Sequence, residues 1–155
     1  MVVMSKVFVK IFTIAVLFLN SVVSNDAILV ETISKGTGPQ VTASHKYRSM
    51  VTLYIENEDK SKTPSGWSTR KEEGAARDSP FEFQPGVGLI TGWTEGVLQM
   101  KEGERAFLHV PANKGYGANP MGSPNAGAGG FYIPANSNLL FDIEILGKAN
   151  LASDL

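Results

Sequence analysis

Only one stretch of this chain has helical periodicity, and it lies between Pro80 and Tyr116. Four apolar side chains recur there at a spacing that lines them up on one helical face: Ile90, Trp93, Val97 and Met100. Thr91 is a candidate N-cap for this helix and Gly103 a candidate stop. Trp93 therefore belongs to the buried side of a short helix, either as a core residue or as the floor of an apolar pocket.

Elsewhere the apolar residues follow β patterns, because they alternate with polar residues or are β-branched and aromatic. Strands are expected over residues 28–33, 47–55, 80–83, 104–110 and 139–146. Long loops are expected over 56–78 and 115–130, which are rich in polar residues, glycine and proline. Several antiparallel strands and one short helix predict an α+β fold, with a sheet packed on the single helix.

The same alternation assigns side chains to faces. It puts Phe81 and Phe83 on one face, and it separates His109 from the aliphatic residues of its strand, which makes it a solvated or edge histidine. Asp142 and Glu144 are expected to face solvent. Trp67, isolated in a polar loop, is either a loop anchor or the wall of a pocket.

The composition excludes several classes of function. A chain of 155 residues with 43% hydrophobic and 19% charged residues is typical of one globular domain. The net charge of −1 and the absence of a basic stripe argue against nucleic acid as a partner. There is no cysteine and only two histidines, so thiolate chemistry is excluded and neither a histidine metal site nor a Ser-His-Asp triad is expected.

Residues 1–24 read as a secretory signal peptide, since Lys6 and Lys10 precede an apolar run over 11–19 and small residues follow it. The apolar run is too short for a membrane anchor, which needs about 20 residues, so no stable span is expected after cleavage. The domain should then occupy residues 25–148, with a short tail over 149–155. The expected location is the endoplasmic reticulum lumen or the exterior of the cell, with a plastid lumen as another destination on that route.

Aromatic residues beside glycine-rich turns are the main candidates for a functional site in this chain. They are Trp67, Phe81, Trp93, Tyr116, Phe131, Tyr132 and Phe141. Core packing accounts for about half of them, while Tyr116, Phe131 and Tyr132 flank a loop and are suited to the rim of an apolar pocket. Rotation about an X–Pro bond suits such a pocket, because the twisted amide loses resonance and becomes less dipolar. That reaction requires no nucleophile and no cofactor.

Several segments together resemble the FKBP-type peptidyl-prolyl cis-trans isomerases over residues 27–147. They are 30–33 with 36–38, 80–83, Gly86, 90–97, Met100, 103–106, 115–117, 133–136 and 139–146. The resemblance implies a half-barrel of antiparallel strands around one short helix, a hydrophobic prolyl pocket, proline-containing polypeptides as substrates and macrolide inhibitors as ligands. A monomer is expected.

Carried over position by position, the resemblance makes Trp93 the pocket floor. The residues expected to act on the substrate are Trp93, Tyr116, Phe141, Phe81 and Ile90, and those expected to bind it are Leu89, Ile133, Tyr132, Trp67 and Tyr54. In the family, the backbone N–H matching Ile90 and the hydroxyl matching Tyr116 donate hydrogen bonds to a bound ligand.

The first half of the domain departs from the family pattern. The usual His-Tyr-Thr-Gly and Phe-Asp motifs are replaced by segments 50–54 and 66–69, so the aspartate is absent, and Trp67 stands for one member of the Phe-Asp pair. Tyr54 is the candidate for the family tyrosine. The alternative function is therefore a binding module or chaperone on the same fold with little isomerase activity.

Overall fold

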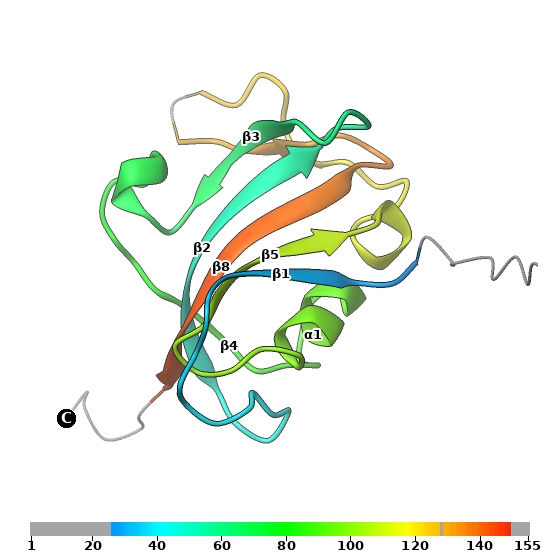
Figure 1. Cartoon of the computed structure of the whole chain (residues 1–155). Coiled ribbons are helices and arrows are strands. Elements are labelled where there is room, and N and C mark those ends of the chain that lie inside the picture. The colour runs from blue at the N-terminus through cyan, green and yellow to red at the C-terminus, as the bar shows by residue number, and fades with distance from the viewer. Residues whose placement is uncertain (1–25, 128, 150–155) are drawn as a thin grey trace, which may run out of the picture.

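The computed structural model describes residues 26–127 and 129–149. A curved antiparallel sheet wraps around one short helix, α1 (Thr91–Val97), as Figure 1 shows. The strands are β1 (Leu29–Ser34), β2 (Tyr47–Glu56), β3 (Lys62–Ser68), β4 (Phe81–Phe83), β5 (Arg105–Val110) and β8 (Asn138–Lys148). The expected α+β half-barrel is confirmed.

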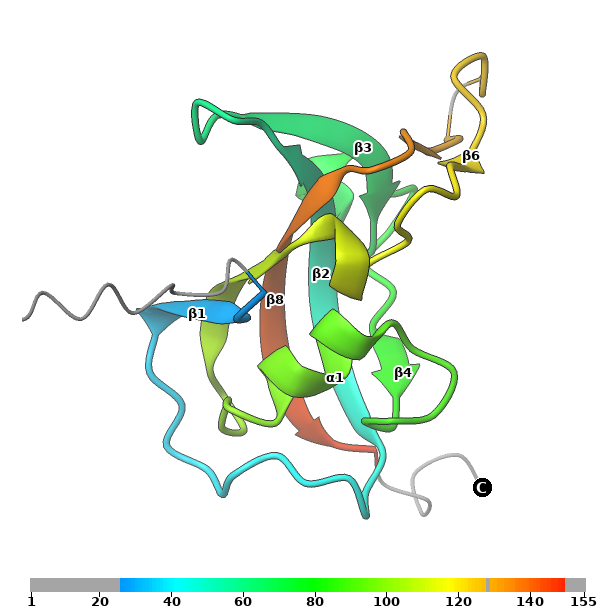
Figure 2. The same cartoon turned by 90° about the vertical axis from the view of Figure 1, so that its right-hand side faces the viewer.

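The sheet has the order β1-β5-β8-β2-β3, and β4 pairs with the same strand, β2, as β3 does. A small separate hairpin joins β6 (Met121–Gly122) to β7 (Tyr132–Ile133), and 3₁₀ turns occupy Lys71–Glu73 and Ala112–Lys114. Figure 2 shows α1 lying within the curve of the sheet, with β4 beside it. We call the face of the sheet toward α1 concave and the opposite face convex.

The core lies on the concave face, where alternate residues of β2, β5 and β8 meet α1. On β5 the side chains of Ala106, Leu108 and Val110 are buried, as their alternation predicts. Gly92 and Gly96 let the helix approach β5 closely, because a Cβ atom on either would press on Val110 or Leu108. The sequence Ile-Thr-Gly-Trp thus puts the first turn of the helix directly on the sheet.

Both ends of the helix differ from the expectation. The N-cap of α1 is Ile90, whose extended backbone precedes the helix, and Thr91 is the first helical residue. The helix ends at Val97, so the buried Met100 lies in the following turn and Gly103 is not the stop.

The expected loop over 56–78 contains β3, which tolerates Pro64 because it is an edge strand. Asp142 is buried, because Arg70 and Arg105 cover the convex face at that point.

The predicted signal peptide over 1–24 and most of the predicted tail lie outside the described residues. Within residues 26–127 and 129–149, no helix has the length and hydropathy needed to cross a membrane.

Candidate functional site: an aromatic cavity at the helix N-terminus

A cavity of about 250 Å³ opens where the start of α1 meets the concave face of the sheet. Eleven residues from the strands, the helix and the loops line it: Leu53, Trp67, Phe81, Gly88, Leu89, Ile90, Trp93, Tyr116, Phe131, Ile133 and Phe141. None of them carries a charge. We call this site the aromatic cavity.

Trp93 lies at the centre of the aromatic cavity and is only 3% exposed. The edges of three other aromatic rings meet it nearly at right angles, with centroid distances of 5.8 Å to Phe81, 5.5 Å to Phe83 and 5.0 Å to Phe141. Edge-to-face contacts of this kind fix ring orientation as well as burying area. The indole is therefore held rigidly, with core residues on one side and the cavity on the other.

Trp67 forms a side wall of the aromatic cavity. Its ring meets that of Phe81 at 85° and a centroid distance of 6.0 Å, and Phe81 in turn contacts Trp93. Of the two interpretations of Trp67, the pocket wall is the one that the structure supports. β3 presents the indole to the cavity because the strand pairs with β2 up to Ser68, the next residue.

Two hydrogen-bond donors lie at the edge of this apolar surface. Ile90 has an extended backbone, its carbonyl accepts the Thr94 N–H at 3.3 Å, and its own N–H finds no acceptor among residues 26–127 and 129–149. The Tyr116 hydroxyl likewise has no partner in the described part of the chain. Burial raises the pKa of Tyr116, so its hydroxyl keeps its proton at neutral pH.

This combination of aromatic floor, apolar walls and two donors has counterparts in known proteins. The family model for FKBP-type peptidyl-prolyl cis-trans isomerase matches residues 43–146. The chain belongs to the FKBP-type peptidyl-prolyl cis-trans isomerases.

Individual relatives agree with this assignment. FK506-binding protein 1 of Gibberella zeae is 39% identical over 114 residues, which cover 73% of this chain and 90% of the relative. A peptidyl-prolyl cis-trans isomerase of Schizosaccharomyces pombe is 49% identical over 71 residues, covering 45% of this chain and 56% of the relative. The crystal structure of AtFKBP13 superposes with a TM-score of 0.60 at 26% identity, covering 79% of this chain and 93% of that one. The matches favour the isomerase over a binding module with little activity.

Eight of the ten site residues predicted for this FKBP-type isomerase line the aromatic cavity, and Tyr54 and Tyr132 do not. Along β2 the side chains alternate, so Leu53 reaches the cavity while Tyr54 lies on the convex face and donates its hydroxyl to Glu73 at 2.9 Å. On β7 the same alternation turns Ile133, not Tyr132, into the cavity. The set carried over from the family omits Leu53, Gly88 and Phe131. Phe131 agrees with the loop-flanking aromatic pattern, which places it at the rim of a pocket, and the burial of Leu53 follows from the face that it shares with Val51 and Ile55.

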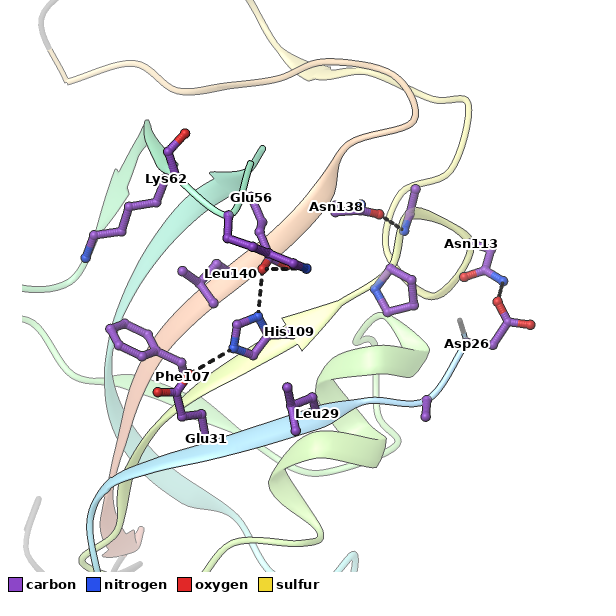
Figure 3. Close-up of a pocket in the computed structure, with 15 residues that line it drawn as sticks. Asp26, Leu29, Glu31, Glu56, Lys62, Phe107, His109, Asn113, Asn138 and Leu140 are labelled. Carbon is purple, nitrogen blue, oxygen red and sulfur yellow. Dashed lines mark hydrogen bonds and ion pairs between the residues drawn. The ribbon is translucent and has the colours of Figure 1, made fainter. Parts of the chain in front are cut away.

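The isomerase also has a larger hollow of about 990 Å³ on its convex face, which Figure 3 shows in close-up. His109 lies across it, with Nδ1 at 2.9 Å from Glu56 and Nε2 at 3.4 Å from Glu31. Asn113 donates to Asp26 at 2.6 Å. His109 is half-buried and hydrogen-bonded rather than freely solvated. Because these polar groups bond to one another, the hollow offers few free groups to a ligand, and we locate the functional site in the aromatic cavity.

The aromatic cavity contains no group suited to acid–base or metal chemistry. In the described ranges, no three histidine, aspartate or glutamate side chains are close enough together to hold a metal ion. What the cavity can do is bind an apolar ring, exclude water from it and donate hydrogen bonds to neighbouring carbonyls.

Proposed function

We propose that the aromatic cavity is the prolyl site of this enzyme and that it catalyses X–Pro rotation without a covalent step. The proline ring lies on Trp93, between Phe81 and Phe141. The Ile90 N–H and the Tyr116 hydroxyl donate hydrogen bonds to carbonyl groups of the substrate backbone. The observation that supports this most is the buried Trp93, held by three aromatic edges next to two donors that have no acceptor among the described residues.

The physical basis is the difference between the planar and the twisted amide. Rotation has a barrier of about 18–20 kcal/mol because the planar amide is stabilised by resonance. At the twisted transition state that resonance is lost, and the amide is less dipolar than in the ground state. A dry aromatic surface therefore solvates the twisted form relatively better than water does, which lowers the barrier through differential binding.

The dimensions of the aromatic cavity fit a single ring. Pockets for drug-sized molecules usually measure about 300–1,000 Å³, and this cavity holds about 250 Å³. A prolyl ring enters it fully, while the flanking peptide stays on the rim formed by Leu89, Tyr116 and Phe131. The relative from Gibberella zeae is named an FK506-binding protein, and we extend that class of macrolide to this chain as a competitor for the same cavity.

Intermolecular NMR contacts test the assignment of the site. A short X–Pro peptide mixed with the protein should give nuclear Overhauser effects between its proline ring protons and the Trp93 indole protons. An FK506-type macrolide should remove them by competition. Contacts to residues of the convex hollow, such as Leu29 or Phe107, without contacts to Trp93 would contradict the assignment.

We further propose that residues 1–24 direct the enzyme into the secretory pathway and are removed there. The support is the sequence pattern alone: two lysines, an apolar run of nine residues and small residues before Asn25. N-terminal sequencing of protein recovered from cells should give an end near Asn25, and an intact Met1 end would contradict the proposal.

A further inference from the structure

The strand on which Trp67 lies and the strand on which Phe81 lies share one edge of β2, with a gap between them. β3 pairs with β2 from Glu56 to Thr52, and β4 pairs with it from Ser49 to Tyr47. Between these two pairings, Val51 faces the connecting segment, residues 69–80, in place of a strand. The side wall of the aromatic cavity therefore crosses a break in the sheet.

Polar groups replace the missing backbone ladder in this gap. The Thr69 N–H donates to the Val51 carbonyl at 2.8 Å, and the Val51 N–H donates to Thr69 Oγ1, also at 2.8 Å. The next residue, Arg70, donates from Nη2 to the Met50 carbonyl at 3.2 Å. Thr69 thus satisfies the open edge of β2. Arg70 binds from the convex face to Met50, whose carbonyl points toward β8 because backbone groups alternate along a strand.

Two carboxylates of β8 also hold the Arg70 side chain. Its side chain is only 6% exposed, and Nη1 lies 3.2 Å from Glu144 while Nη2 lies 3.9 Å from Asp142. Asp142 also receives two hydrogen bonds from Arg105, at 2.9 and 2.8 Å. Two cations and two carboxylates therefore balance each other beneath the gap, and Asp142 directly follows Phe141, whose ring lies in the cavity.

We propose that Arg70 is a positioning residue for the isomerase reaction, which keeps Trp67 against Phe81 by tying the segment between β3 and β4 to the convex face of β2 and β8. This inference rests on the proposed function of the aromatic cavity. Arg70 touches no substrate. It acts because the planar guanidinium can donate to Met50 and to Glu144 at the same time, which a single ammonium group cannot do with the same geometry.

Arg105 provides the matched control. It belongs to the same charge cluster and carries the same guanidinium, but its hydrogen bonds go to Asp142, and none joins it to the connecting segment. If Arg70 acted only through the charge balance of the cluster, Arg70→Lys and Arg105→Lys should have the same effect on the cavity.

The chain has two tryptophans, Trp67 and Trp93, so 5-fluorotryptophan labelling gives one ¹⁹F NMR signal for each, assigned with Trp67→Phe. In Arg70→Lys we expect the Trp67 signal to shift or broaden and kcat/KM for an X–Pro peptide to fall about 10-fold, since a misplacement of about 1 Å can cost up to about 100-fold. In Arg105→Lys we expect both signals unchanged and kcat/KM within about twofold of wild type.

The proposal is overturned if the Trp67 signal of Arg70→Lys coincides with that of the wild type, or if Arg105→Lys changes it equally. Should Arg70→Lys fail to fold, the charge-balanced double variant Arg70→Gln, Glu144→Gln takes its place. Its Trp67 signal should also shift or broaden, and a signal identical to that of the wild type would overturn the proposal. An inactive wild type would contradict the proposed function, whereas the ¹⁹F comparison would still decide the role of Arg70.

Discussion

Gly66 packs directly against the main-chain carbonyl of Gly130, leaving no room for a Cβ atom. The contact joins β3, which carries Trp67, to the loop that carries Phe131, so two walls of the aromatic cavity meet at a pair of glycines. Gly66 also has φ of +89°, a region that L side chains rarely adopt.

Gly66→Ala should therefore lower both stability and activity. Positive φ alone costs an alanine about 1–2 kcal/mol, and the collision with Gly130 adds to this by moving the Phe131 loop. Gly74→Ala is the control, since Gly74 has φ of +97° and open space where its Cβ would be. Urea unfolding should show a larger loss for Gly66→Ala, and peptide KM should rise only in that variant. Equal effects of the two variants would contradict the importance of the contact.

Asp142→Asn should be one of the most destabilising single substitutions on the convex face. Removing one partner from a buried ion pair typically costs about 3–5 kcal/mol, because the remaining charge stays buried. Asp142 accepts from Arg105 and lies 3.9 Å from Arg70, whose charge is the buried one. Glu144→Gln should cost less, since Glu144 is partly exposed and water can replace it. Chemical denaturation of both variants measures this, and a loss for Asp142→Asn no greater than that for Glu144→Gln would count against it.

Tyr54 should make the fold sensitive to alkali. Burial and the neighbouring Glu73 raise the pKa of Tyr54 from 10.0 to about 12. Between these values the unfolded chain loses the phenolic proton while the folded chain keeps it, so stability falls as pH rises through this window. Tyr54→Phe removes this contribution, and its urea midpoint should fall less steeply than that of the wild type from pH 10 to 12. Parallel curves would refute the assignment.

The sequence alone predicts those features of the fold that depend on the spacing of apolar residues. Alternation along 105–110 and the helical spacing of Trp93 and Val97 reflect burial against one core, and both are found in the structure. The same reasoning wrongly predicts that Asp142 is exposed, because alternation shows which face of the sheet a residue occupies but not whether another segment covers that face. Arg70, which covers it, is distant in sequence.

The aromatic cavity shows the same limit. Trp93 and Phe141 were predictable from element periodicity together with the family resemblance. β3 was not, because Lys62–Ser68 contains a proline and a glycine and is a strand only through its pairing with β2. Leu53 was missed in favour of Tyr54 because the register of one strand decides which of two neighbours points inward.

The central claim is that the aromatic cavity catalyses X–Pro rotation, and cis-to-trans relaxation of a short X–Pro peptide tests it most directly. We predict that micromolar wild-type protein accelerates the relaxation, and that Phe141→Leu loses about 10-fold in kcat/KM, as expected for an altered contact worth about 1.4 kcal/mol in the transition state. Phe107→Leu, on the convex face, should retain full activity. No acceleration by the wild type, or equal losses in the two variants, would contradict the claim.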